Sequence, residues 1–501
     1  MLLPVDHISP SQLQAGQGDL VRELAWASVC GALSGGVILV AFALSLGATP
    51  VQIGLLAAIP FLTQAVQLPA TLLIERLRMR RRISVLTLTA ARALILMLAV
   101  LPFLPPGAPA LALLIAAHVL IAGMSAVGGC AVNSWLHQLI PHQQLGQFFA
   151  RRLFSGTTLA CVATLFAGLL VERLRGSAQP LQGYALVFAL SALAGFASSF
   201  FLARAPEPRM HRAGPEMPLR ERLGAPFQDA NFRHLLVFLA AWTVAANLAS
   251  PFLTVYLIEQ RGYAVSTVTG LWVLSQFANA LTVFWWGRLS DRLTNKAVLA
   301  VVLPVHFICM LSLVFVDALN SPLLQLVVLA LIHAVLGVAT GGIGLATGNL
   351  GLKLAPHGKG TAYLAAIGLV TAVAGGIAPI AAGALAGAFQ ARELSAVVRW
   401  AAPGALKEVA LVSFAHWEFL FALSALAGLY VMHALSRVDE GSDISERLVM
   451  QEFALEAWRS VNSLSSISGA LGSLFPFERL NERRKWWSDR LGPRTARVAE
   501  Q

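Results

Sequence analysis

The stretch GRLSDRLTNK, residues 287–296, places four charged side chains between two strongly apolar segments. It follows LTVFWW, residues 281–286, and precedes AVLAVVLPVHFICM, residues 297–310. An apolar segment of about 20 residues is long enough to cross the core of a bilayer as a helix. A charged cluster between two such segments is therefore typical of a turn at the membrane surface.

The composition of the whole chain indicates a membrane protein. Of its 501 residues 57% are hydrophobic and 12% are charged, with a mean hydropathy of +0.70, whereas soluble domains carry about 25% charged residues. We attribute the formal net charge of +11 to basic cytosolic loops and not to nucleic-acid binding. The four cysteines lie in apolar runs without framework spacing, so we expect no disulfide, metal or cofactor.

Apolar segments divide the chain into about twelve expected transmembrane helices. The expected fold class is an all-α membrane protein whose helices form two pseudo-symmetric bundles of six. The segments lie near 26–47, 52–73, 84–104, 109–134, 155–172, 183–203, 234–257, 265–286, 297–317, 322–347, 362–388 and 413–435.

Basic residues predict the orientation of these helices. The loops ERLRMRRR (75–82) and GQFFARR (146–152) and the segment 204–233 are rich in arginine, whereas loops 48–51 and 105–108 hold no Lys or Arg. Positive loops stay in the cytosol, so both termini are expected there, in a bacterial inner (plasma) membrane. The N-terminus lacks the pattern of a cleaved signal peptide.

Polar segments mark the expected domain boundaries. The proline-rich segment 205–232 separates the two bundles, and loop 389–412 is expected to form a short interfacial helix. The tail carries a cationic and aromatic cluster that suits contact with anionic lipid: Arg479, Arg483, Arg484, Lys485, Trp486 and Trp487. A solvated tail explains these residues equally well. The expected division is 1–25 cytosolic lead-in, 26–204 first bundle, 205–232 linker, 233–437 second bundle and 438–501 cytosolic tail.

The chain also contains an internal repeat. Sliding it by 216 residues aligns the segment TLLIERLRMR, residues 71–80, with the opening stretch. The aligned pairs are Glu75 with Asp291, Arg76 with Arg292, Arg80 with Lys296, Gly54 with Gly270 and Asn133 with Asn349. Each half thus carries its charged loop between its own second and third helices.

This arrangement resembles the major facilitator superfamily, whose signature G-x-x-x-D-R-x-G-R-K follows the second helix of a six-helix repeat. Gly287, Asp291, Arg292 and Lys296 match it, while Thr294 and Asn295 depart from it. In the first half Thr71 and Arg78 replace the glycines and Glu75 the aspartate. The resemblance covers about 1–437 and implies alternating access, with the two halves rocking about a central site. The implied cytosolic gate comprises Gly287, Asp291, Arg292, Lys296, Glu75, Arg76, Arg80, Asn133 and Asn349. The alternative is that these charges only determine the orientation of the helices in the membrane.

The family's cavity helices (first, fourth, seventh and tenth) hold no charged residue at mid-depth here, which predicts a polar but uncharged cavity. His118 and His333 lie near the bilayer middle, 215 residues apart, and are the first candidates for a substrate contact or proton carrier; an interhelical hydrogen bond is the alternative. His306 is expected to be peripheral. The weaker polar candidates are Asn247, Trp242, Gln64, Gln67, Gln276 and Asn279.

The leading function is secondary active or facilitative transport of a small neutral or amphiphilic solute by a monomer in the bilayer. A non-transporting sensor or scaffold that uses the tail for interactions is the alternative. An enzyme is disfavoured, because the sequence offers no nucleophile–base spacing and no H-E-x-x-H motif.

Overall fold

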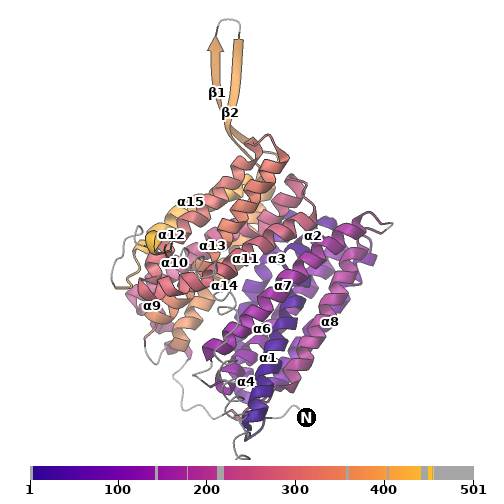
Figure 1. Ribbon diagram of the computed structural model, residues 1–501, viewed down its shortest axis with the longest axis vertical. Helices are drawn as coiled ribbons and strands as arrows, with labels where there is room; N and C mark the ends of the chain where they lie inside the picture. The colour runs from indigo at the N-terminus through magenta and orange to yellow at the C-terminus, as the bar shows by residue number, and fades with distance from the viewer. Residues whose placement is uncertain are drawn as a thin grey trace, which may run out of the picture.

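A computed structural model describes residues 4–141, 145–177, 179–210, 219–356, 360–402, 405–441, 449–453 and 455. The expected basic and aromatic cluster at Arg479–Trp487 and the rest of the distal tail lie outside these residues. Within them the chain is almost entirely helical, and its helices form two bundles joined side by side (Figure 1).

The first bundle is built around its first helix, which packs against the fifth and sixth spans, α7 and α8, while α5 packs against α6 and α8. Its elements are α1 (Pro10–Ser34), α2 (Gly36–Ser45), α3 (Pro50–Leu62), η1 (Thr63–Val66), α4 (Gln67–Leu77), α5 (Arg80–Leu98), η2 (Leu101–Phe103), α6 (Ala108–Leu139), α7 (Leu145–Arg175) and α8 (Gln182–Arg204).

The second bundle repeats this order after a short linker helix, α9 (Leu219–Gln228). In it, α10 packs against α14 and α15, and α13 packs against α11 and α12. Its elements are α10 (Ala230–Val255), η4, a π-helical turn (Tyr256–Gln260), α11 (Val265–Arg292), α12 (Asn295–Ser312), η5 (Leu313–Ala318), α13 (Pro322–Leu354), α14 (Gly360–Phe389), β1 (Glu393–Ala402), β2 (Ala405–Ala415) and α15 (Glu418–Ser436).

Eleven helices in the described residues are long and apolar enough to cross a membrane, and a twelfth span is made by a bent pair. The bent pair is Pro50–Val66 with Pro69–Leu77, which meet at 43°. Its start follows from local chemistry, because Thr49 caps the helix together with Gln52 and Pro50 occupies the first turn. The expected count of about twelve membrane helices is thus confirmed.

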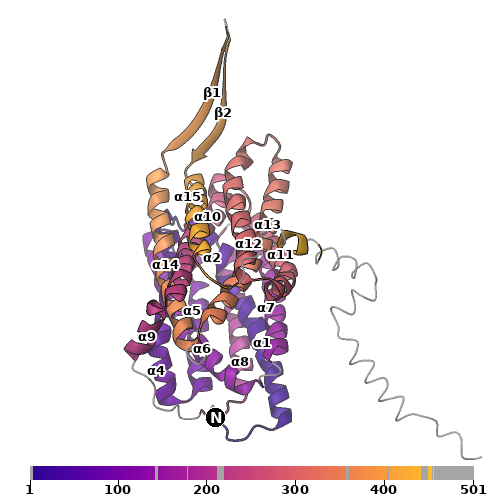
Figure 2. The ribbon, with the colours of Figure 1, turned by 90° about the vertical axis from the view of Figure 1, so that its left-hand side faces the viewer.

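The two ends of the bundles differ (Figure 2). The N-terminus lies at one end, where Val5 pairs with Pro208 beyond α8. We call this end the terminal face; it also carries the loops with Glu75 and Asp291. The strands β1 and β2 project from the opposite end, which we call the hairpin face.

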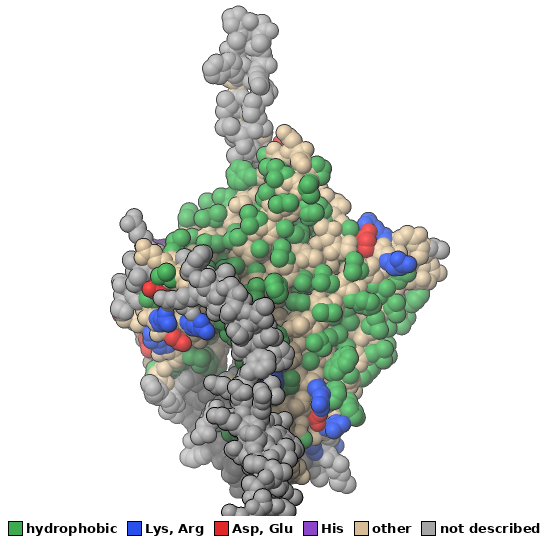
Figure 3. All heavy atoms as spheres, viewed as in Figure 1, with side chains coloured by type: hydrophobic (Ala, Val, Ile, Leu, Met, Phe, Trp, Pro, Cys, Tyr) green, Lys and Arg blue, Asp and Glu red, His purple; other side chains and the backbone are tan. Residues whose placement is uncertain are grey.

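The hairpin itself corrects an expectation. The segment predicted to form an interfacial helix within 389–412 is instead an antiparallel pair of strands, with Glu393 opposite Ala415 and Ala402 opposite Ala405. Leu394 and Val397 are exposed on it. Most other exposed apolar side chains cover the flanks of the bundles, where Figure 3 shows hydrophobic atoms over most of the face and charged groups gathered near the helix ends. Such a surface suits contact with lipid chains.

Candidate functional site

The two halves meet closely near the hairpin face. There α3 packs against α14, and α7 packs against α11. Glycines allow this approach: a Cβ at Gly54 would overlap the Pro379 carbonyl, one at Gly383 the Pro50 carbonyl, and one at Gly168 the side chain of Thr269. Small residues of this kind let helix backbones come into contact within lipid.

The hydrophobic core shows the same difference between the hairpin face and the terminal face. Its largest cluster lies towards the hairpin face and joins the halves, with Phe42 and Phe188 from the first and Phe252 and Trp417 from the second. Towards the terminal face the clusters separate, one centred on the second half and one on Trp135 of the first. The molecule is therefore closed between its halves at the hairpin face, and each half has a core of its own at the terminal face.

The acids of the two repeat-related loops are not engaged across the halves. Asp291 is exposed, and within the described residues it makes no recorded hydrogen bond or ion pair. Arg292 lies 4.0 Å from Glu452 of the tail. Glu75 is half-buried, and its carbonyl accepts a hydrogen bond from Arg78. Arg76 is exposed.

The remaining predicted gate residues lie near these loops. A Cβ at Gly287 would make only an ordinary contact with Leu345, so crowding does not require glycine there. Asn349 donates to the Ser290 hydroxyl over 3.3 Å, whereas Asn133 is exposed. The structure thus ties Asn349 to the loop of its own half and leaves its repeat partner without an equivalent contact among the described residues.

The cation at the end of the repeated segment 71–80 is part of a buried network. Arg80 is 2% exposed, and its Nε lies 3.4 Å from the fully buried carboxylate of Glu207. Glu207 also accepts hydrogen bonds from the backbone amides of Arg80 (2.7 Å) and Arg81 (3.1 Å). The Arg80 guanidinium in turn donates to the carbonyls of Ser134 and Pro208. A carboxylate therefore holds the N-terminus of α5, where the helix dipole favours negative charge.

The second half contains an equivalent arrangement. Glu440 accepts hydrogen bonds from the Asn295 side chain (2.6 Å) and the Lys296 amide (2.7 Å) at the start of α12, and from the Lys353 ammonium (3.1 Å) at the end of α13. Burial alone would raise the pKa of Glu440, but these bonds outweigh it and the pKa lies below its usual value.

Sequence reasoning missed both carboxylates. Arg80 and Lys296 are aligned by the repeat, and each meets an acid that follows the sixth helix of its own half. The sequences around these acids, APEPR (205–209) and VDEGS (438–442), are not alike. Their only shared signal is position, an acidic residue shortly after each sixth span.

The two predicted histidines have different surroundings. His333 is buried in α13, and its Nδ1 lies 2.8 Å from the Leu329 carbonyl of the same helix. His118 is half-buried in α6. No recorded contact joins His118 to another predicted site residue in the part of the chain described here.

The amide candidates lie in different surroundings. Gln64 and Gln67 are hydrogen-bonded to each other at the bend of the second span. Asn279 on α11 packs against Gly341 and lies 3.5 Å from the Thr340 hydroxyl on α13. Asn247 donates to the Thr243 carbonyl within α10, and Gln276 is half-buried on α11.

The ring of Trp242 packs against α12, the third helix of its own half. The expectation for His306, a residue of that helix, is wrong. The Trp242 ring meets His306 edge-on, with centroids 5.0 Å apart, and Phe307 at 5.9 Å. His306 was expected to be peripheral but is 3% exposed, and neither ring nitrogen has a recorded partner in the described structure. The α12 helix packs against α13 and α15, and the Trp242 ring of α10 lies beside His306, which sequence position alone did not indicate.

The interior of the first half carries charges that the search of the cavity helices missed. Glu23 of α1 is 4% exposed and pairs with Arg152 of α7 at 2.6 Å. Arg92 of α5 is 6% exposed; it donates to the Leu88 carbonyl, and its Nε has no recorded partner. Glu23 lies before the predicted first span, but α1 begins at Pro10 and buries it.

Metal binding has no support among the described residues, which contain no cluster of three or more His, Cys, Asp or Glu side chains suited to a metal. All four cysteines are free.

Comparisons with known proteins give one family model and several solved structures with a similar fold. The model of the Major Facilitator Superfamily matches residues 24–379. No curated protein matches in sequence. Solved structures with a similar fold include the nucleoside transporter NupG (TM-score 0.59, 13% identity, 87% of this chain and 100% of that one). A bacterial homologue of the iron transporter ferroportin in an inward-facing state has a TM-score of 0.60 and 15% identity, over 87% of this chain and 100% of that one. A bacterial homologue of the human lysosomal transporter Spinster, also inward-facing, has a TM-score of 0.57 and 14% identity, over 89% of this chain and 97% of that one.

Proposed function

Because the chain belongs to the major facilitator superfamily, we propose that it carries a small neutral or amphiphilic solute across the membrane by alternating access. The family and the transporters that share its fold imply transport and not catalysis. One of the similar structures is a nucleoside transporter and another is a homologue of an iron transporter. The likeness therefore supports the activity and leaves the solute to the residues of this chain.

The observation that carries the proposal is the one-sided contact between the halves. The glycine-mediated seams at Gly54, Gly383 and Gly168 and the shared core lie towards the hairpin face. Alternating access requires such a seam to break while another forms at the opposite face. The exposed Asp291 is available for that second seam.

The basic loops support placing the terminal face in the cytosol of a bacterial inner membrane. In that orientation the molecule is inward-facing, and the loops around Glu75 and Asp291 form the cytosolic gate. Their carboxylates would accept hydrogen bonds from the opposite half when the gate closes. Arg80 and Lys296 then act within their own halves, by fixing the start of the helix that follows each loop.

Polar, uncharged side chains support the solute class. His118, His333, Asn247, Gln276 and Asn279 lie on helices of the family's cavity or its borders, and Gln64 and Gln67 lie at the bend of the second span. A site with few charges suits a solute with few charges, because an unpaired buried charge is costly. Either histidine serves as a hydrogen-bonding contact or a proton carrier.

The test starts from binding and proceeds to flux. Purified full-length protein is screened against metabolites by thermal shift, since a ligand raises apparent stability. A hit is then followed into proteoliposomes with wild type, His118→Gln and His333→Gln. Loss of flux in either variant, with the thermal stability retained, supports a role in the site. Flux that survives both replacements and ignores a pH gradient removes the histidines from the mechanism.

The alternative function is a non-transporting sensor or scaffold that uses the tail for interactions, and the first part of the tail packs on the second half. Val449 is fully buried, and Phe453 stacks on Trp286 of α11 with ring centroids 4.3 Å apart. Truncation after Leu455 tests the scaffold alternative, because a transporter keeps its flux while a scaffold loses its function with the distal tail.

A further inference from the structure

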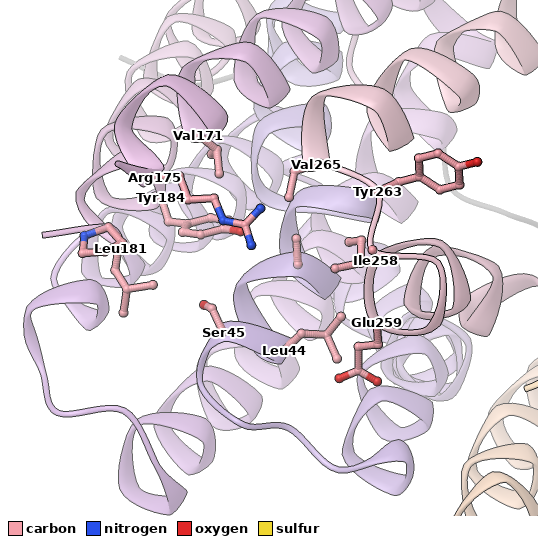
Figure 4. A pocket seen from close by; sticks show the side chains of 13 residues that line it. Leu44, Ser45, Val171, Arg175, Leu181, Tyr184, Ile258, Glu259, Tyr263 and Val265 are labelled. Atoms are coloured by element: carbon pink, nitrogen blue, oxygen red, sulfur yellow. The ribbon is translucent and has the colours of Figure 1, made fainter. Parts of the chain in front are cut away.

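A cavity of about 350 Å³ opens between the two halves at the hairpin face. Its walls come from the ends of α2, α7 and α8 in the first half and from η4 and the start of α11 in the second. Figure 4 shows the side chains that line it. The volume is within the range of sites that hold small molecules.

The cavity receives one charge of each sign, and each comes from a different half. Arg175 ends α7, and in Figure 4 its guanidinium reaches into the cavity. Its recorded ion pair is with Glu172 one turn earlier, at 3.7 Å, with 68% of the Arg175 side chain exposed. Glu259 of η4 is exposed and has no recorded hydrogen bond or ion pair among the described residues. Both charged groups are thus available to a ligand.

Apolar and aromatic groups separate these charges. Leu44 and Ile258 line the cavity from opposite halves. Tyr184 forms part of the wall, and its ring packs against Phe42 of the shared core at 5.2 Å. The wall is therefore supported from behind, which favours a defined shape over a loose surface hollow.

The cavity also lies beside the seam that closes the halves. Val171 and Val265 line it, each about one helical turn from the Gly168–Thr269 contact. Any movement that opens the hairpin face separates Arg175 from Glu259 and takes the cavity apart. A molecule that touches both walls binds this closed state more tightly than the open one, and so shifts the population towards it.

We propose that this cavity is a regulatory site for a small zwitterion with an apolar body. Its anionic group pairs with Arg175, its cationic group pairs with Glu259, and its body lies against Leu44 and Ile258. Occupancy from the hairpin side holds the halves closed there and slows their exchange. This site is separate from the central transport site and goes beyond the proposed function.

An amino acid with its two charges at opposite ends of an apolar chain, and its two single-charge relatives, test the charge requirement. 6-Aminohexanoate carries both charges, pentylamine keeps only the cation, and hexanoate keeps only the anion on nearly the same body. Binding to full-length protein in nanodiscs is measured by calorimetry. Closure is measured by electron–electron distances between spin labels at Gln179→Cys and Asn320→Cys, exposed positions on the hairpin face of each half, after the four native cysteines are replaced.

We expect 6-aminohexanoate to bind and to narrow the distance distribution towards the closed state, with the two relatives weaker by at least about tenfold, or 1.4 kcal/mol. Arg175→Gln and Glu259→Gln should each reduce the affinity for 6-aminohexanoate by a similar factor. Arg173→Gln, on the same turn of α7 but outside the cavity lining, is the matched control and should bind normally.

Three results would overturn the proposal. One is no binding of 6-aminohexanoate at millimolar concentration. Another is binding that survives both Gln variants, which would place 6-aminohexanoate elsewhere, including the central site. The third is a change in closure in the Gln variants without any ligand effect, which would make Arg175 and Glu259 a direct latch. None of these readouts depends on transport, so failure here is distinguishable from failure of the proposed function.

Discussion

Replacing Glu207 by alanine should destabilise the first half strongly. The substitution removes a fully buried carboxylate that accepts hydrogen bonds from two backbone amides at the start of α5. It also leaves the Arg80 guanidinium, which is 2% exposed, without its counter-charge. The amides and the guanidinium stay buried, because Trp135 and the segment from Pro206 to Pro208 still cover them.

The magnitude follows from this burial. Breaking a buried ion pair by removing one partner costs roughly 3–5 kcal/mol, since an uncompensated charge stays behind. A unit of 150–250 residues changes its melting temperature by about 2–4 °C per kcal/mol. The first half is of this size, so we expect the thermal transition of the purified protein to fall by about 6–20 °C.

The assay is a thermal unfolding scan in detergent, with variants prepared in the same micelle. Glu207→Gln keeps one acceptor oxygen for the amides and should lose about half as much. Asp291→Ala removes an exposed carboxylate from the other loop and should change the transition little, as surface substitutions usually alter stability by less than about 0.5 kcal/mol. A drop for Glu207→Ala no larger than that of Asp291→Ala would refute the idea that the carboxylate holds α5 in place.

Three further outcomes follow. The lowered pKa of Glu440 means that its contribution to stability is present at neutral pH and is lost as the pH falls below about 4.5. The melting difference between wild type and Glu440→Gln should therefore stay constant from pH 7 to about pH 4.5 and shrink as the pH is lowered further. Gly54→Val should push α3 away from α14 and raise thiol labelling at the hairpin face, while Gly270→Ala, its repeat partner with open space around it, should not. Arg92→Phe should leave the melting temperature unchanged or higher and should alter flux; a fall of several degrees would show that the arginine is structural.

The fold could be predicted from the sequence because the repeat and the lipid both constrain it. The length of each apolar segment is set by the bilayer, and the aligned residues Arg80 and Lys296 both lie within the first two residues of the third helix of their half. What these two residues bind could not be predicted. Their partners lie 127 and 144 residues further along the chain, in segments without sequence similarity, and only the packing of the third helix beside the sixth brings them together.

The hairpin shows a different limit. It was expected to form a short interfacial helix, and its segment does contain alanine, leucine, glutamate and lysine, which favour helices. The dipeptide Pro403–Gly404 is a turn signal, and valines flank it on both sides. Those two features agree with the observed strands. In a loop outside the bilayer, no lipid face imposes a helical period, so turn chemistry outweighs composition.

The repeat also provides an internal comparison that explains the buried arginine. In the first half Gly195 of α8 makes room for the side chain of Arg92 on α5, and in the second half Gly428 of α15 makes room for Phe307 on α12. The two glycines are equivalent, because Glu207 follows the first at the same spacing as Glu440 follows the second. One fold therefore accepts either an aromatic ring or a guanidinium in this contact between the third and sixth helices.

An apolar residue at such a position is commonly at least as stabilising as a buried charge. The packing of the helices thus does not account for the cation. A buried charge next to α1, a helix of the expected cavity, adds positive potential to the first half that the second half lacks. We infer that the arginine is retained for its effect on the solute or on the movement of the halves. Replacing Arg92 by phenylalanine, the residue type that fills this contact in the other half, therefore tests its roles in stability and in flux separately.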